Sequence, residues 1–204
     1  MRFLLFLLLA LPLTASAQTR SNPTGLFLHT QGQLMGYEAQ DDDADAEFSV
    51  GALGFGQRVG YGFNRTFTLL VGYDAALGGT DDESDLPNDV AFYGDLLLGT
   101  QINLGGPGAR LVPYLQAGLV GHVVAFDTTS DDDEEDFNLA GGSIQLGGGL
   151  RYFLTPTFAL DAGLEALGGT LEPGSDDARR FTRGEEFGFG AARLTLGVTG
   201  YLRL

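Results

Sequence analysis

The chain has 204 residues, and its 11 basic side chains against 27 acidic ones give a formal net charge of −16. This balance excludes nucleic acid as an expected partner, because phosphate recognition needs basic contacts. Cysteine is absent, so neither disulfide bonds nor thiol chemistry supports the fold. The 32 glycines exceed an average share, and the length suits one domain with a sizeable core.

The N-terminus has the three parts of a secretory signal peptide. A short basic start precedes an almost wholly apolar run over residues 3–13, and Ala-Ser-Ala at residues 15–17 matches the small-residue cleavage pattern. The apolar run is too short to cross a bilayer as a helix, which argues against a retained membrane anchor. We therefore predict a signal peptide over residues 1–17 and a mature domain over residues 18–204.

Eight later segments alternate apolar and polar residues with a period of two, which predicts β-strands. In chain order, their apolar faces include Leu26 and Leu28, Leu69 and Val71, Leu96 and Leu98, Leu115 and Leu119, Ile144 and Leu146, Leu160 and Leu164, and Leu194 and Leu196. The second segment, residues 48–61, is rich in glycine and its phase stays open. Arg58 belongs to its polar face unless a β-bulge shifts the register.

The connections between these segments alternate between long acidic and short neutral ones. The long ones cover residues 40–47, 80–89, 127–137 and 172–186, and the short ones cover residues 62–66, 105–110 and 155–157. Glycine, proline and asparagine in the short ones predict tight turns. This order predicts an all-β fold, an eight-stranded antiparallel up-and-down barrel.

The alternation fits two kinds of barrel, a soluble one with its apolar face inside and a membrane barrel with its apolar face toward lipid. The polar face carries few charges, whereas a soluble exterior usually has roughly 25–35% charged residues. Long and short connections alternate as in outer-membrane barrels. The segments also exceed the mean soluble strand of about 5–6 residues and reach the ~9–11 needed to cross a bilayer. We therefore predict a transmembrane β-barrel.

Three stretches carry a resemblance to a known family. "RVGYGFNRTFTLLVGYDA" at residues 58–75, "LVPYLQAGLVG" at 111–121 and "GGGLRYFLTPTFALDAGLEA" at 147–166 resemble the repeating hairpins of small outer-membrane β-barrel proteins of the OmpA/OmpX type. The resemblance covers essentially residues 24–204. It implies a porin-like fold in the outer membrane of a Gram-negative bacterium, but it says little about function, because the members of that family do different things.

Six charged residues on the polar faces form the candidate site. Four carboxylates can face two guanidinium groups across the narrow interior, and a lone buried ion would cost several kcal/mol. We expect these residues to form an ion-pair and hydrogen-bond network that makes the barrel rigid and closes it, and a narrow water-filled pore remains the alternative. The six residues are Asp74, Asp95, Arg151, Asp161, Glu165 and Arg193.

The sequence offers no clear catalytic, cofactor or metal site. Enzymes of this size that modify lipid A need a His–Ser–acid set on the lipid or outer face, whereas His29 and His122 both fall on the polar face with no serine at a recognisable spacing. "SDDDEED" at residues 130–136 lacks the EF-hand spacing of calcium ligands. We expect interior histidines bonded to their neighbours, and a solvated acidic loop that binds divalent cations only weakly.

The function expected from the sequence is that of a non-enzymatic outer-membrane protein with long acidic extracellular loops, which contributes to envelope integrity or surface contacts. A narrow passive channel or carrier for small solutes is the alternative, and a lipid-A-modifying enzyme comes third. The expected partners are outer-membrane lipid and lipopolysaccharide, with divalent cations at the loops. We expect a monomer without a cofactor.

Overall fold

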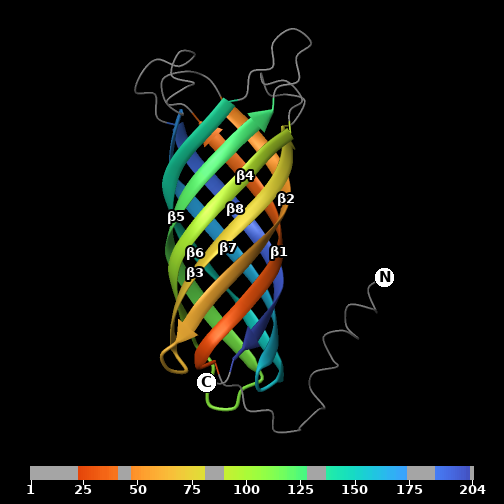
Figure 1. Ribbon diagram of the computed structural model, residues 1–204, viewed down its shortest axis with the longest axis vertical. Helices are drawn as coiled ribbons and strands as arrows, with labels where there is room; N and C mark the ends of the chain where they lie inside the picture. Colours follow the sequence, from red (N-terminus) through yellow and green to blue (C-terminus); the bar gives the residue numbers. More distant parts are fainter. Residues whose placement is uncertain (1–22, 41–46, 81–89, 128–136, 174–186, 203–204) are drawn as a thin grey trace, which may run out of the picture.

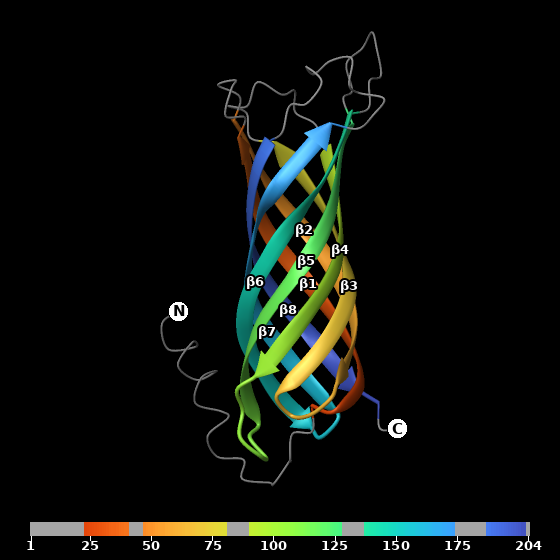
Figure 2. The same ribbon diagram turned by 90° about the vertical axis from the view of Figure 1, so that its left-hand side faces the viewer.

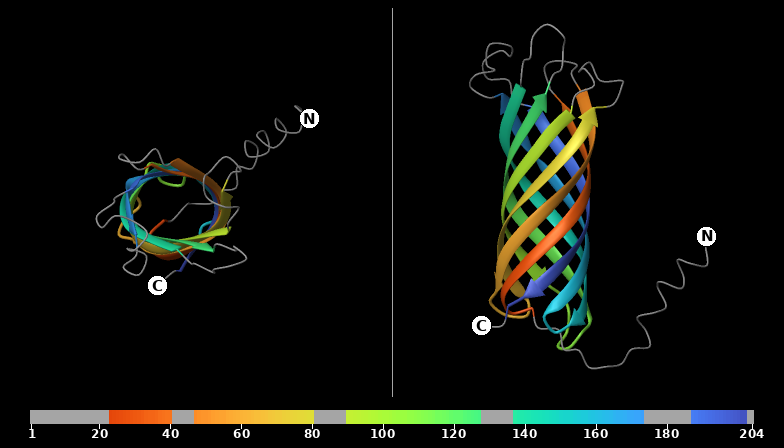
Figure 3. Two further views of the ribbon diagram at one scale, coloured as in Figure 1. Left: turned by 90° about the horizontal axis from the view of Figure 1, so that it is seen from above. Right: turned by 45° about the vertical axis from the view of Figure 1, so that its right-hand side comes forward.

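Eight antiparallel strands pair in chain order and the last pairs with the first, so that the sheet closes into a barrel (Figures 1 and 3). The computed structural model describes residues 23–40, 47–80, 90–127, 137–173 and 187–202. The strands are Gly25–Gln40 (β1), Glu47–Gly62 (β2), Phe67–Thr80 (β3), Val90–Asn103 (β4), Leu111–Asp127 (β5), Phe137–Thr155 (β6), Phe158–Pro173 (β7) and Phe187–Tyr201 (β8). The predicted eight-stranded up-and-down barrel is confirmed. In the described part of the chain, no helix is long and apolar enough to cross a membrane.

The two ends of the barrel differ in their connections. The turns after β2, β4 and β6 lie at one end, which we call the short-turn end (Figure 2). There, the Asn64 side chain accepts hydrogen bonds from the backbone N–H groups of Thr66 and Phe67, both at 2.8 Å, and Gly108 takes a positive φ of 78°. The strand ends that flank the four acidic segments lie at the opposite, long-connection end. The predicted signal peptide and most of each acidic segment lie outside the described residues.

The register of the strands fixes the width of the barrel. A path through paired residues that starts at Thr30 on β1 returns to β1 at Gln40, ten residues farther along the strand. The path runs through Gln57, Tyr73, Leu96, Gly121, Gly142, Thr170 and Gly188. A shift of this size requires strongly tilted strands, typically about 35–45° from the axis, and an eight-stranded barrel then has an interior that side chains can fill.

The phase of β2, which the sequence leaves open, is continuous. Its pairings with β1 and β3 run without a break, and Arg58 is buried in the lumen while Leu53 and Phe55 are exposed. The register shift lies elsewhere, between Phe153 and Thr155 of β6 where this strand pairs with β7. No bulge therefore moves Arg58 away from the polar face.

The outer wall is apolar along its middle. Many of its leucines are more than half exposed, among them Leu53, Leu77, Leu96, Leu119, Leu164 and Leu196. Glu38 and Glu172 are exposed near the long-connection end, and Arg65 and Arg110 lie in turns at the short-turn end. No outward-facing side chain that the structure describes between these two pairs is charged. The prediction that the apolar face points outward is confirmed.

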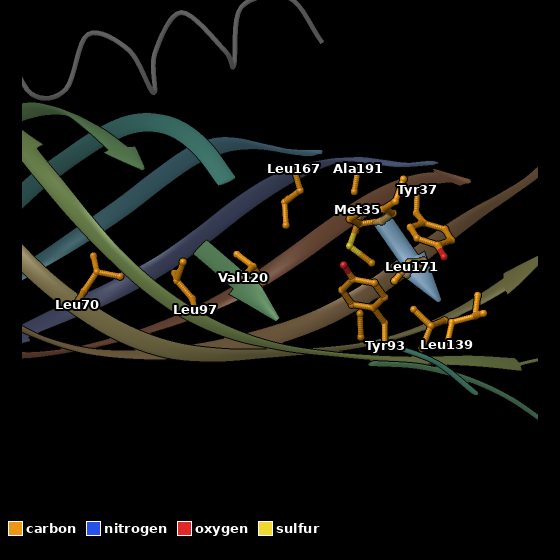
Figure 4. Packing of buried hydrophobic residues seen from close by; sticks show 14 of the residues in the cluster. Met35, Tyr37, Leu70, Tyr93, Leu97, Val120, Leu139, Leu167, Leu171 and Ala191 are labelled. Atoms are coloured by element: carbon orange, nitrogen blue, oxygen red, sulfur yellow. The ribbon is translucent and has the colours of Figure 1, made fainter. Parts of the chain in front are cut away.

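Apolar side chains close the lumen near both ends. At the short-turn end, the Tyr201 ring lies 5.6 Å from Phe27 and 5.8 Å from Phe153 between centroids. Toward the long-connection end, the Tyr37 ring lies 5.0 Å from Phe189 and 5.9 Å from Tyr93. Figure 4 shows Tyr37 and Tyr93 gathered inside the barrel with Met35, Leu139 and Leu171. The space between these two layers holds the polar residues, with a few buried apolar side chains such as Leu97 and Val120 beside them.

The apolar outer wall leads to a prediction about charge and depth. Leu98 lies well inside β4 and Leu104 follows its end at the short-turn end, and both are more than half exposed. Leu98→Arg should lower the free energy of unfolding by about 2–4 kcal/mol and Leu104→Arg by about 0–1 kcal/mol, because the cost of a charge on the lipid face depends on its depth. Urea unfolding in lipid vesicles measures both, and equal losses would contradict an outer wall that faces lipid.

Candidate functional site

The candidate site is the polar middle of the lumen, where every second residue of each strand points inward. All six predicted charged residues are buried there: Asp74 on β3, Asp95 on β4, Arg151 on β6, Asp161 and Glu165 on β7, and Arg193 on β8. They come from five different strands, and the barrel brings them together. Arg58 on β2 joins them.

Arg193 joins two carboxylates from neighbouring strands. Its Nη1 donates to Asp74 Oδ2 at 3.1 Å, and its Nη2 donates to Asp95 Oδ2. The guanidinium carbon also lies 5.6 Å from the centroid of the Tyr93 ring, a cation–π distance. Arg193 is only 1% exposed, so both ion pairs form away from water.

Arg58 forms the two-pronged pair in the lumen. Its Nη1 and Nη2 donate to the two carboxylate oxygens of Glu165 at 2.6 and 2.9 Å. Nη1 also donates to Gln116 Oε1 at 3.1 Å, and Nη2 lies 3.5 Å from Asp74 Oδ2. A parallel fork of this kind is the strongest geometry available to arginine and carboxylate. Because it runs from β2 to β7, the pair joins strands that are not neighbours in the sheet.

Arg151 occupies an aromatic cage nearer the short-turn end. Its Nε donates to Asp161 Oδ1 and its Nη1 to the Tyr201 hydroxyl, both at 2.6 Å. The rings of Phe27, Tyr114 and Tyr201 lie between 5.4 and 5.9 Å from the guanidinium carbon. The ion pair and the cation–π contacts together hold the buried guanidinium group of Arg151 in place.

His29 links the Arg193 group to the Arg151 group. Its Nε2 lies 2.9 Å from Gln31 Oε1, and Gln31 Nε2 donates to Asp74 at 3.1 Å. On its other side, Nδ1 lies 2.8 Å from Thr199 Oγ1, which donates to Asp161 at 2.6 Å. One hydrogen-bonded network therefore extends from Asp95 to Tyr201.

His122 has neighbours that the sequence analysis did not find. Ser143 lies 21 residues farther along the chain, yet its Oγ is 2.5 Å from His122 Nε2, while Nδ1 contacts Asp95 Oδ1. The sequence gives no sign of this contact, because a separation of 21 residues is not a recognisable motif spacing. The spacing reflects the pairing of β5 with β6, in which Ser143 opposes Val120, the inward residue next to His122 on the same face.

The Ser143–His122–Asp95 order is that of a catalytic triad, but its surroundings do not suit catalysis. The His122 and Asp95 side chains are fully buried, and the imidazole packs 4.9 Å from the Phe189 ring. Asp95 is shared with Arg193, and the hydroxyl faces the lumen rather than lipid. The three side chains form one more part of the polar network. In the described ranges, no cluster of three metal-ligating His, Cys, Asp or Glu side chains occurs.

The charges of the lumen nearly balance. Among the described residues, three buried guanidinium groups face four buried carboxylates, and every one of these carboxylates contacts an arginine. Removal of one member of a buried pair leaves an uncompensated charge in a poorly polarisable interior, which is strongly unfavourable. The network is thus a connected unit in which each arginine holds residues from different strands.

Comparison with known proteins gives a family and a set of folds. The profile of the family described as "Outer membrane protein beta-barrel domain" matches residues 3–193. Among solved structures, OprG from Pseudomonas aeruginosa is similar at a TM-score of 0.57 and 12% identity, over 90% of this chain and 99% of that one. Neisserial surface protein A is similar at a TM-score of 0.56 and 15% identity, over 86% of this chain and 97% of that one. AlkL, solved in lipid bilayers, is similar at a TM-score of 0.56 and 17% identity, over 94% of this chain and 96% of that one. At these identities the likeness concerns the fold. None of the curated proteins matches the chain.

The Arg58–Glu165 pair gives a test of the network. Arg58→Met should lower the free energy of unfolding by about 3–5 kcal/mol, because it leaves Glu165 buried without its cation. Arg58→Met combined with Glu165→Met should recover most of this loss, since no unpaired charge remains. Urea unfolding in vesicles measures the cycle, with Arg65→Met in an exposed turn as the control. A single variant as stable as the control would show that the pair does not hold the barrel together.

Proposed function

Because this chain belongs to the outer membrane protein β-barrel domain family, we propose that it is a non-enzymatic protein whose closed barrel anchors four acidic connections at the cell surface. Membership of the family and the lipid-facing apolar wall locate the barrel in the bacterial outer membrane. There the connections contribute to the integrity of the envelope or to contacts with molecules outside the cell.

The observation that carries this proposal is the filled lumen. Two layers of rings and apolar side chains enclose a network in which three arginines bind carboxylates from other strands. The cavity between Arg58, Gln116 and Arg151 measures about 10 Å³, which is about the space that one water molecule needs. In this part of the lumen a solute could pass only if buried ion pairs separated, and this favours an anchor over a channel.

The orientation of the barrel follows from its two different ends. Outer-membrane barrels have short periplasmic turns and longer extracellular loops. The three short turns, with Arg65 and Arg110, then face the periplasm, and the strand ends next to Glu38 and Glu172 face outside. In this orientation the four acidic segments of the sequence connect strands at the outside end of the barrel.

The acidic connections give the outside end a high density of negative charge. Like charges in a tethered segment repel one another and favour extended, hydrated chains. Lipopolysaccharide phosphates carry the same sign, so direct contact with them is unfavourable unless divalent cations lie between. We propose that such cations are shared weakly between the acidic connections and neighbouring lipopolysaccharide, and that the barrel acts as a monomer.

The closed lumen predicts an electrical result. Refolded protein in a planar lipid bilayer should give no unitary current steps at neutral pH, because the ion pairs and the ring layers leave no continuous path for ions. Single-channel recording measures this, and insertion is checked separately by the protease resistance of the same vesicles. Reproducible current steps from inserted protein would favour the narrow channel instead.

The proposed role of the acidic connections predicts that their replacement weakens binding to lipopolysaccharide but does not impair folding. Replacement of residues 131–136 by serine and asparagine should leave assembly unchanged and should reduce calcium-dependent binding to lipopolysaccharide vesicles. Heat-modified mobility on gels reports assembly, and vesicle flotation with and without calcium reports binding. A matched exchange of the acidic residues at 81–85 tests whether the loops act together. Failure to assemble, or unchanged binding in both variants, would contradict the proposal.

A further inference from the structure

We propose that the lumen binds one proton at His29, so that this side chain is an imidazolium cation in the folded barrel. His29 lies on β1 opposite Thr199 of β8, at the pairing that closes the sheet. It is 6% exposed, and both of its ring nitrogens have a neighbour within hydrogen-bond distance. The hydrogens available to those neighbours determine the protonation of the ring.

The Nδ1 side requires a donor. Thr199 Oγ1 lies 2.8 Å from Nδ1 and 2.6 Å from Asp161 Oδ2. A hydroxyl has one hydrogen, and a carboxylate that already pairs with Arg151 Nε at 2.6 Å is ionised and can only accept. The Thr199 hydrogen therefore points to Asp161. The short contact to His29 is then a hydrogen bond only if Nδ1 carries the hydrogen.

The Nε2 side also requires a donor. Gln31 has its amide nitrogen 3.1 Å from Asp74 Oδ1 and its amide oxygen 2.9 Å from Nε2. The opposite amide orientation would bring the Gln31 oxygen against a carboxylate oxygen, with no hydrogen between them. The Gln31 oxygen therefore faces His29 and accepts. Nε2 must carry a hydrogen as well, so both ring nitrogens are protonated.

The charge of the lumen leaves room for one added proton, although the count alone does not say which histidine carries it. Three buried arginines face four buried carboxylates among the described residues, which leaves one negative charge without a balancing positive charge. A proton on His29 brings the total to zero. The unbalanced carboxylate charge need not lie directly beside His29. Gln31 links the imidazole ring to Asp74, and Thr199 links it to Asp161.

The charged groups around His29 are compatible with a cation. Asp161 of β7 lies 3.7 Å from Nδ1. Burial disfavours a charged ring, and so do Arg151 from β6 and Arg58 from β2, which line the same small cavity as His29. Each of these arginines, however, already binds its own carboxylate, Asp161 and Glu165 respectively. Asp74 of β3 acts through Gln31.

His122 provides an internal contrast. Its Nδ1 contacts the Asp95 carboxylate and lies 2.8 Å from the Tyr93 hydroxyl, and its Nε2 faces Ser143 Oγ at 2.5 Å. The structure gives Ser143 no other acceptor for its hydrogen among the described side chains, so this hydrogen can point at Nε2. A neutral ring with its hydrogen on Nδ1 then serves Asp95 and Ser143 at once, so His122, unlike His29, does not require a second proton.

Nitrogen NMR of the histidine rings tests this assignment directly. The chain has two histidines, so refolded protein labelled with ¹⁵N-histidine gives two ring systems, and His122→Asn assigns them. At pH 7.5, where about nine-tenths of free histidine is neutral, His29 should show two protonated ring nitrogens and His122 one. A bare nitrogen on His29 at this pH, including the case in which the proton resides on Asp161, would overturn the proposal.

The pH dependence of unfolding gives a second test. Above about pH 6.5 the unfolded chain releases the histidine proton while the folded barrel keeps it. The folding equilibrium constant should therefore fall about tenfold for each pH unit until His29 itself loses its proton. His29→Gln cannot donate to both neighbours and should remove this slope, whereas His122→Gln should retain it.

One further control separates a proton site from a merely structural histidine. Thr199→Val keeps the volume and removes the acceptor for Nδ1, so it should narrow the pH range over which the slope persists. If His29→Gln does not fold, the comparison of wild type with Thr199→Val decides. Equal slopes in wild type and His29→Gln, or in wild type and Thr199→Val, would refute a proton bound at His29.

Discussion

Closure of the sheet by the pairing of β1 with β8 is the constraint on which the rest of the structure depends. In lipid, an open strand edge would leave backbone N–H and C=O groups without partners, and each would cost several kcal/mol. Eight strands can close only at a fixed combination of tilt and register, here a shift of ten residues. This combination sets the radius, and the radius leaves an interior that side chains must fill. The polar network fills it.

Glycine makes the charged filling possible. A Cβ on Gly72 would lie 2.7 Å from Arg58 Cγ, and one on Gly197 would lie 2.8 Å from His29 Cε1. Long side chains can cross the lumen only because their neighbours on the next strand have none. On the outer wall, a Cβ on Gly36 or Gly51 would meet nothing within 4 Å. The high glycine content therefore has a packing reason inside the barrel that it lacks outside.

The sequence predicts the strands and their faces well because a period of two is a local property. The alternation of Leu194 and Leu196 with Arg193 and Thr195 in β8 can be recognised without knowledge of the neighbouring strands. Glycine carries no such signal, so the phase of β2 and the place of Arg58 stayed open. The contacts between buried side chains are still harder to predict. That Arg58 binds Glu165, or that Ser143 contacts His122, depends on register and on the shift of ten residues, and neither can be read from one strand alone.

The separation of the exposed charges along the axis gives the barrel an electrical polarity. Glu38 and Glu172 mark one end of the apolar wall and Arg65 and Arg110 the other. To turn the inserted barrel over, carboxylates and guanidinium groups would both have to enter hydrocarbon at the same time, each at a cost of several kcal/mol. Inversion would also draw the acidic segments through the bilayer. The barrel therefore keeps the orientation across the bilayer that it adopts during insertion, and the charges at its two ends are sufficient to maintain it.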